Sequence, residues 1–159
     1  MKIMLNKRIV TLALFAIITF IIMIVWQSTR PAKIMAVNGV ALFVKNIPSS
    51  DAGKIKWWND NKKLFSEKYH LMNNPDKFLI IVMDFGDGYQ ELPGPGWTSL
   101  DKSEDDFICF DNIKSRKKCI YKDWVFDVSG SMSKKVFINI AGKTYIQTSD
   151  GKTELAHEK

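Results

Sequence analysis

The chain opens with an apolar segment that has no polar face. Residues 9–26, IVTLALFAIITFIIMIVW, contain no charge and hardly a polar group. A helix packed in a soluble domain needs a polar face, and this segment offers none. At 1.5 Å per residue its length is roughly 27 Å, close to the hydrocarbon core of a bilayer. The pattern predicts a transmembrane helix over residues 9–27.

A cleaved signal peptide is the alternative for this segment. Signal peptides have an apolar region of about 7 to 15 residues and a cleavage site of small residues. Here the apolar run is longer, and QSTRPAK follows it, where Arg30 and Pro31 do not suit cleavage. We therefore expect an uncleaved signal anchor, followed by a short linker at 28–32.

Beyond residue 32 the pattern changes to short apolar runs separated by turn residues. Asn38-Gly39, the pair best suited to a two-residue hairpin turn, lies between strands expected near 33–38 and 40–46. The β-branched run KFLIIVMDF, residues 77–85, predicts a central strand. Further strands are expected in FICFDNI, CIYKDWVFDV, KKVFINIA and KTYIQTS.

One helix is expected between the hairpin and the central strand, in GKIKWWNDNKKLFSEKYHL, with candidate caps among the residues that follow Pro48. At about 100° per residue it has two apolar stripes. The first stripe is expected to face the core. The second contains Trp57 and Leu64, which either belong to the core as well or contact a partner protein or the membrane surface.

These elements together predict an α+β domain, with one main helix packed on a mostly antiparallel sheet, and not a βαβ arrangement. The domain is expected to cover residues 33–150, and residues 151–159 to form a mobile tail. The loop at 92–106, LPGPGWTSLDKSEDD, is long enough to be kept for binding, which makes Trp97 a third candidate for partner binding. An insertion of no consequence is the alternative.

Positive charge near the span predicts its orientation. The eight residues before it, expected to form a cytoplasmic tail (1–8), contain Lys2, Lys7 and Arg8, against Arg30 and Lys33 on the other side. The outer domain is therefore expected in the periplasm of a bacterium, behind an inner-membrane anchor. Four of the 23 basic residues flank the span, which leaves 19 against 17 acidic residues, so the net charge of +6 does not predict a nucleic-acid partner.

The two cysteines test this orientation independently. Cys109 and Cys119 enclose nine mostly polar residues, and His70 and His157 are poorly placed to complete a metal site with them. A disulfide is expected, which would contribute about 3 kcal/mol through loop closure. Such a bond persists in an oxidising compartment, in agreement with a periplasmic domain.

The stretch IIVMDFGDGYQE, residues 80–91, could be mistaken for a magnesium or calcium motif. A kinase needs a glycine-rich loop, a lysine and a His-Arg-Asp loop besides Asp-Phe-Gly, and the sequence contains neither of these two loops. A helix-loop-helix calcium site that started at Asp84 would have glycines at two of its ligand positions. Gly86, Asp87 and Gly88 instead predict a tight turn, after which YQEL starts the return strand. Weak cation binding by Asp84, Asp87 and Glu91 is the alternative.

Catalysis is not expected, because the two histidines are the only general bases available to a serine or cysteine nucleophile. No metal and no cofactor is expected. An envelope enzyme that uses the acidic residues around Asp84 and Asp101 remains an alternative.

GKIKWWNDNKKLFSEKY, DFGDGY and the CFDNIKSRKKCIYK segment, behind a single span and an Arg-Pro break, resemble the enterobacterial putative membrane proteins of domain of unknown function 943. The resemblance covers nearly the whole chain and implies an inner-membrane protein with a small outer domain, without catalytic residues to carry over. The 92–106 loop departs from the family pattern in being longer. The residues on the family's motifs are Gly53, Trp57, Trp58, Asp84, Gly86, Asp87, Gly88, Tyr89, Cys109 and Cys119.

The sequence thus predicts a single-span inner-membrane protein whose periplasmic domain binds a partner, such as another envelope protein. An immunity-type inhibitor that protects the envelope against a toxin is an alternative, by analogy with other small anchored domains.

Overall fold

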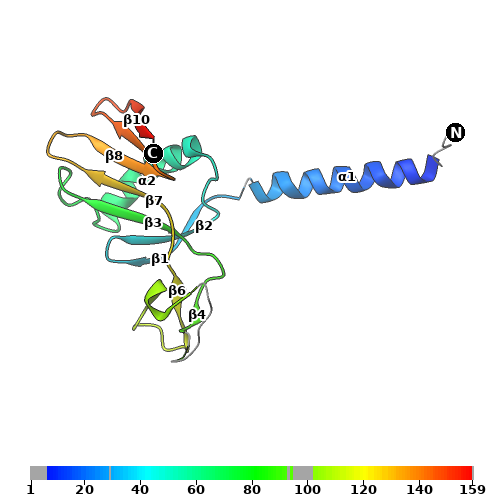
Figure 1. Ribbon diagram of the computed structural model, residues 1–159, viewed down its shortest axis with the longest axis horizontal. Coiled ribbons are helices and arrows are strands. Elements are labelled where there is room, and N and C mark those ends of the chain that lie inside the picture. Colours follow the sequence, from blue (N-terminus) through cyan, green and yellow to red (C-terminus); the bar gives the residue numbers. More distant parts are fainter. Residues whose placement is uncertain (1–6, 29, 93, 95–101, 159) are drawn as a thin grey trace. The chain divides into compact units, whose positions relative to one another are not determined.

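A computed structural model describes residues 7–28, 30–92, 94 and 102–158 of the chain (Figure 1). The chain divides into two compact units, Met1–Pro31 and Ala32–Lys159. Each unit is described by itself below.

The first unit contains one helix, α1, Lys7–Ser28, which is 22 residues long. It begins two residues before the segment predicted from the apolar pattern. Its described side chains, from Ile9 to Ile24, are almost all apolar and lie exposed along the helix. Within the described residues, no helix is long and apolar enough to cross a membrane. The transmembrane assignment therefore stays a prediction.

The second unit is built on a seven-stranded sheet with the order β1-β2-β3-β7-β8-β9-β10. The first hairpin lies where it was predicted, but its turn is displaced by one residue. Asn38 at the end of β1 pairs with Ala41 at the start of β2, so the loop consists of residues 39 and 40, and Gly39 has a φ of 55°. The strands are β1 Lys33–Asn38, β2 Ala41–Lys45, β3 Leu79–Asp84, β7 Asp123–Gly130, β8 Val136–Ile140, β9 Lys143–Gln147 and β10 Thr153–Glu158.

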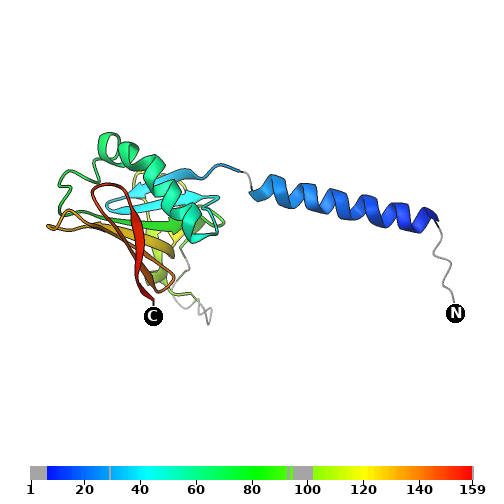
Figure 2. The same cartoon turned by 90° about the horizontal axis from the view of Figure 1, so that it is seen from above.

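The helix α2, Asp51–Glu67, lies across one face of this sheet (Figure 2). Ser50 caps it, since its hydroxyl accepts a 3.1 Å hydrogen bond from the Gly53 amide. Both predicted stripes contribute to the core, in which Trp58 and Phe65 are fully buried. The Trp58 and Phe65 rings stack with their centroids 5.6 Å apart.

The pairing of β2 with β3 is parallel, whereas the other neighbours in the sheet are antiparallel. The expectation that the chain contains no βαβ unit is therefore wrong at this point, although the α+β class is confirmed. Parallel neighbours require a crossover of a dozen residues or more, and the connection that contains α2 provides one. Periodicity within each segment does not reveal this pairing.

A second, three-stranded sheet covers the opposite face at the β1-β2-β3 end. It has the order β4-β6-β5 (Figure 1), formed by β4 Gln90–Glu91, β6 Lys117–Tyr121 and β5 Phe107–Cys109, with a short 3-10 helix, η1 Glu104–Asp106, before β5. Along β2, Leu42 and Val44 pack against α2, while Phe43 packs on the opposite face against Phe110, which directly follows β5, with ring centroids 5.9 Å apart. The main sheet is therefore covered on both faces at this end.

Two predicted strands belong to a different sheet than expected. YQEL was predicted to return along β3, but β4 pairs with β6 instead. CIYKDWVFDV was predicted as one strand, but it divides at Lys122 into β6 of the second sheet and β7 of the main sheet. Both corrections arise because the chain changes sheet without a change in its apolar pattern.

The end of the chain, predicted as a mobile tail over 151–159, instead contains β10, which pairs with β9. A turn precedes it, closed by a 2.9 Å hydrogen bond from the Gly151 amide to the Thr148 carbonyl. Gln147 is 2% exposed and donates to the Thr153 hydroxyl at 2.9 Å. The polar sequence of this segment suggested a tail, but an edge strand needs few apolar side chains.

Candidate functional site

A hollow of the second unit lies at the carboxyl ends of β2 and β3. From β2 the chain leaves towards α2 on one face of the sheet, and from β3 it leaves towards the second sheet on the opposite face. In open sheets, a crevice forms where neighbouring parallel strands send their connections to opposite faces, and ligands bind there. A cleft of about 450 Å³ opens at this position. We refer to it as the β2–β3 cleft.

One wall of the β2–β3 cleft is the connection from β2 to α2. Asn46 has a φ of 59°, a conformation that asparagine tolerates better than most residues, and it turns the chain away from the sheet. Lys54, in the first turn of α2, reaches back and donates a 3.1 Å hydrogen bond from Nζ to the Ser49 carbonyl. Only 11% of its side chain is exposed, so its ammonium group has a restrained position. The residues of this wall are Lys45, Asn46, Ile47, Pro48, Ser49 and Lys54.

The opposite wall contains two carboxylates that face each other across adjacent strands. Asp84 ends β3 and Asp123 begins β7, and the two are direct partners in the antiparallel register. Neither side-chain carboxylate has a hydrogen bond or ion pair with another described residue. The two like charges lie at directly opposed positions, where like charges are unfavourable in a sheet. Asp84 is half-buried and Asp123 is exposed to solvent.

A β-bulge lies directly beside this pair. The register between β3 and β7 shifts between Val82 and Met83, which leaves Val125 without a partner on β3. Val125 lines the cleft. Bulges are frequent beside functional sites, where they redirect a side chain. Here the bulge adds an aliphatic surface next to the two carboxylates.

A smaller cavity of about 180 Å³ adjoins the cleft and shares Asp84, Gly86 and Asp123 with it. Its other wall belongs to the second sheet and the segment before it, where the Lys102 ammonium lies 4.2 Å from the centre of the Tyr121 ring. The remaining lining residues are Phe85, Asp87 and Gln90.

The predicted turn forms the border between the two cavities. Gly86 and Gly88 have φ angles of 48° and 81°, and the Gly88 amide donates to the Phe85 carbonyl at 2.8 Å. The turn interpretation of DFGDG is thus confirmed. Because Gly86 lines both cavities, the same turn also shapes the site.

The acidic alternative, cation binding by Asp84, Asp87 and Glu91, finds no support in the geometry. The Glu91 carboxylate accepts from Arg116 Nε at 3.0 Å, away from the other two. Among the described residues no three His, Cys, Asp or Glu side chains are grouped so that they could hold a metal ion.

The candidates for partner binding have different environments. Trp57 is 8% exposed, and its ring centroid lies 5.5 Å from that of Phe65 and 6.1 Å from that of Phe126. Leu64 is half-buried. The structure thus favours the core alternative for Trp57. Trp97 and Asp101 lie outside the described residues.

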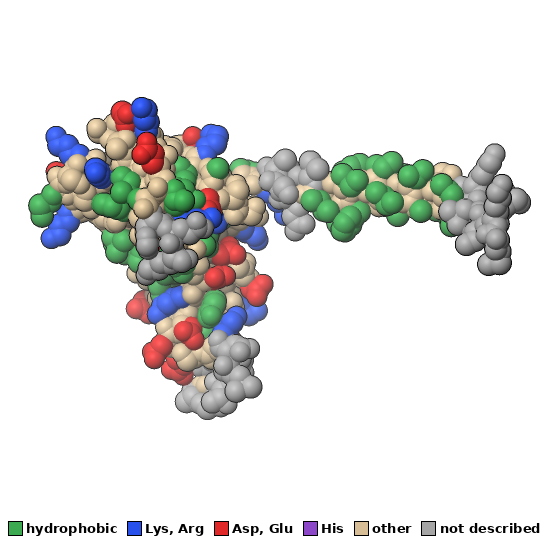
Figure 3. All heavy atoms as spheres, turned by 45° about the horizontal axis from the view of Figure 1, so that its top comes forward, with side chains coloured by type: hydrophobic (Ala, Val, Ile, Leu, Met, Phe, Trp, Pro, Cys, Tyr) green, Lys and Arg blue, Asp and Glu red, His purple; other side chains and the backbone are tan. Residues whose placement is uncertain are grey.

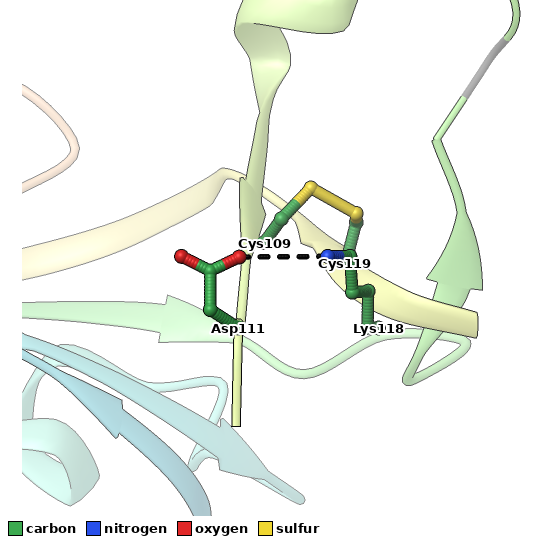
Figure 4. Close-up of a disulfide and its surroundings, with 4 residues drawn as sticks. All are labelled: Cys109, Asp111, Lys118 and Cys119. Atoms are coloured by element: carbon green, nitrogen blue, oxygen red, sulfur yellow. Dashed lines mark hydrogen bonds and ion pairs between the residues drawn. A yellow bond between two sulfur atoms is a disulfide. The ribbon is translucent and has the colours of Figure 1, made fainter. Parts of the chain in front are cut away.

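The predicted disulfide between Cys109 and Cys119 is present (Figure 4). The two residues are direct partners on β5 and β6, with their Cα atoms 3.9 Å apart. Beside the bond, Lys118 Nζ lies 3.4 Å from Asp111 Oδ1. The bond therefore joins neighbouring strands of the second sheet and closes the polar loop between them.

Sequence reasoning did not single out Asp123, Val125, Lys45 or Lys54. For Asp123 and Lys45, the only local signal is a charged residue placed at the end of an apolar run, as in YKDW and FVKN. Such charges usually mark solvated strand ends. The pairing of distant strands is what brings these residues together.

The comparison with protein families agrees with this architecture. A family model described as enterobacterial putative membrane protein, domain of unknown function 943, matches residues 4–156. The chain belongs to this family. No curated protein and no solved structure matches the chain.

The matched region covers α1, the β2–β3 cleft and the disulfide. Family membership therefore applies to both units together. On the face of the second unit drawn in Figure 3, acidic and basic side chains are intermixed. The lining of the cleft likewise contains both signs of charge, the lysines Lys45 and Lys54 and the carboxylates Asp84 and Asp123.

Proposed function

We propose that this protein is a single-span inner-membrane protein whose outer domain binds an envelope component in the β2–β3 cleft and catalyses no reaction. The anchor would be α1, whose 22 residues correspond to roughly 33 Å of helix. The hydrogen bonds of a hydroxyl within α1 support this role. Thr19 Oγ1 donates to the carbonyls of Phe15 and Ala16, at 3.0 and 2.9 Å, so it needs no water.

Two observations support a periplasmic position for the outer domain. The short tail before α1 is the denser basic flank, which favours its retention in the cytoplasm. The Cys109–Cys119 disulfide is of a kind that persists in an oxidising compartment. Neither argument depends on the other.

The observation that carries the binding function is the pair of unpartnered carboxylates, Asp84 and Asp123, in a cleft whose other wall bears ammonium groups. Carboxylates without a partner in the protein can accept charge-assisted hydrogen bonds from a cationic group of a ligand. The described lining of the cleft contains no histidine and no cysteine to act as base or nucleophile. These features favour binding over catalysis.

Topology is tested with single added cysteines in the full chain, labelled in intact cells by a thiol reagent that does not cross the inner membrane. Ser133 lies exposed in the β7–β8 turn, so Ser133→Cys should react, whereas Lys2→Cys should react only after lysis. Labelling at residue 2 and protection at residue 133 would reverse the proposed orientation.

Binding is tested by crosslinking in living cells with a photoreactive amino acid at Lys45, on the rim of the cleft. The matched control is Lys63 on α2, whose side chain is 82% exposed and does not line the cleft. A specific crosslinked species at residue 45, lost in Asp84→Asn/Asp123→Asn, is expected. Equal crosslinking at both positions would refute binding in the cleft.

A further inference from the structure

We propose that the β2–β3 cleft binds a small zwitterion, a compound of dipeptide size that carries an ammonium group and an anionic group a few bonds apart. This inference rests on the proposed function, because it takes the cleft to be the binding site. It adds the chemical class of the ligand.

The carboxylate wall determines the cationic half of the ligand. Asp84 and Asp123 are opposed in register, and neither is neutralised by a described residue. An ammonium group placed between them can donate to both, because it carries three donors. Such a group would convert a repulsion between strands into a bridged ion pair. A metal ion is a poorer candidate, since the described residues offer no group of three suitable ligands.

The lysine wall determines the anionic half. Lys54 uses one donor on the Ser49 carbonyl at 3.1 Å, and its distance of 4.0 Å from Asp51 Oδ1 is too long for a hydrogen bond. Donors of this ammonium group therefore remain for a ligand. Lys45, at the end of β2, also lines the cleft and has an exposed side chain. A carboxylate or phosphate is the complement to this wall.

The volume and the apolar lining limit the size of the ligand. A cleft of about 450 Å³ is in the range of small-molecule sites. Ile47, Pro48 and Val125 provide a short apolar surface between the two charged walls. This surface suits a few methyl or methylene groups. A free dipeptide meets all three requirements, and so does the headgroup of an amine-bearing phospholipid.

The test uses the full chain in detergent micelles and four probes. Alanyl-alanine carries both charges, its N-acetyl form lacks the ammonium group, its amide lacks the carboxylate, and glycerophosphoethanolamine represents a lipid headgroup. Affinity is measured by calorimetry for the wild type, Asp84→Asn, Asp123→Asn and Lys54→Met. The matched control is Asp60→Asn, since Asp60 is an exposed acid on α2, away from the cleft.

We expect at least one of the two intact zwitterions to bind. If alanyl-alanine binds, the dissociation constant should be at least about tenfold higher for each form of the dipeptide in which one charge is blocked. Asp84→Asn and Asp123→Asn should weaken binding by a similar factor, with the control unchanged. Binding of the dipeptide supports a peptide ligand, and binding of glycerophosphoethanolamine alone supports a lipid headgroup. Near-ultraviolet circular dichroism verifies that each variant keeps its fold.

The inference would be overturned if no zwitterion bound, if the N-acetylated dipeptide bound as tightly as the free dipeptide, or if both Asp variants bound the ligand as tightly as the wild type. A calcium titration that reproduces the binding signal and is abolished by Asp84→Asn would replace the zwitterion by a cation. If crosslinking at Lys45 succeeds while all zwitterions fail, the proposed binding function stands and only the ligand class is wrong.

Discussion

Removal of the Cys109–Cys119 bond should destabilise the second sheet more than the main sheet. The cysteines are ten positions apart in the sequence, and the loop-closure relation for that length corresponds to about 3 kcal/mol. Cys119 is 1% exposed, so alanine is a better replacement than serine, which would bury a hydroxyl. The variant is therefore Cys109→Ala/Cys119→Ala.

The free energy of unfolding is measured by urea titration of the full chain in micelles, and local stability by hydrogen exchange. We expect the double variant to lose about 3 kcal/mol. Amides of β5 and β6 should exchange faster, because the bond joins these two strands directly. Amides of β8, which belongs to the main sheet and pairs with neither β5 nor β6, should change only through the global loss of stability.

The control is a reducing agent, which should destabilise the wild type by a similar amount and leave the double variant unchanged. A loss below about 1 kcal/mol would refute the entropic reasoning, because a loop of this length would then be closed already in the unfolded chain. Equal acceleration of exchange in β6 and β8 would show that the two sheets unfold as one unit.

Three further perturbations test the fold and its pH dependence. In Gly130→Ala the new Cβ would lie 2.6 Å from atoms of the Phe78 ring, so calorimetry should show a loss of about 1–3 kcal/mol; an unchanged melting temperature would contradict this packing. Gly86 has a φ of 48° and free space around it, so Gly86→Ala should cost about 1–2 kcal/mol and Gly86→Asn less, and equal losses would show that backbone strain is not the cause. The hydrogen bond from Tyr145 lowers the pKa of Asp51, so this carboxyl contributes stability above its unfolded pKa of about 3.9 that is lost as the pH falls. Urea titrations across the acid range should show that the free energy of unfolding falls less steeply with decreasing pH in Tyr145→Phe than in the wild type. The same pH dependence in both proteins would exclude this linkage.

Several elements were predictable because their causes are local. Gly39 permits the hairpin turn through its positive φ of 55°, and Ser50 caps α2 through a hydroxyl three residues from its donor. The turn at Gly86 and Gly88 follows from the same backbone freedom. The disulfide was predictable from cysteine count and spacing. Each of these features depends on residues within about ten positions of one another.

The candidate site was not predictable in this way. It depends on the parallel pairing of β2 with β3 and on the register that sets Asp84 opposite Asp123, positions separated by long stretches of chain. The same limitation explains why β10 was taken for a tail. A strand is recognised in sequence by apolar alternation, whereas β10 is held by backbone pairing and by the buried amide of Gln147.

The sequence by itself thus determined the apolar helix, the α+β class, the local turns, the covalent link between the cysteines and the family. Only the tertiary structure decided which strands are neighbours, which sheet each strand joins, and where charges of opposite sign meet in a cleft. The physical reason is that periodicity reports whether a side chain is buried, but not what it is buried against. Strand neighbours are selected by chain crossover and by packing on both faces of the sheet, which are properties of the whole domain.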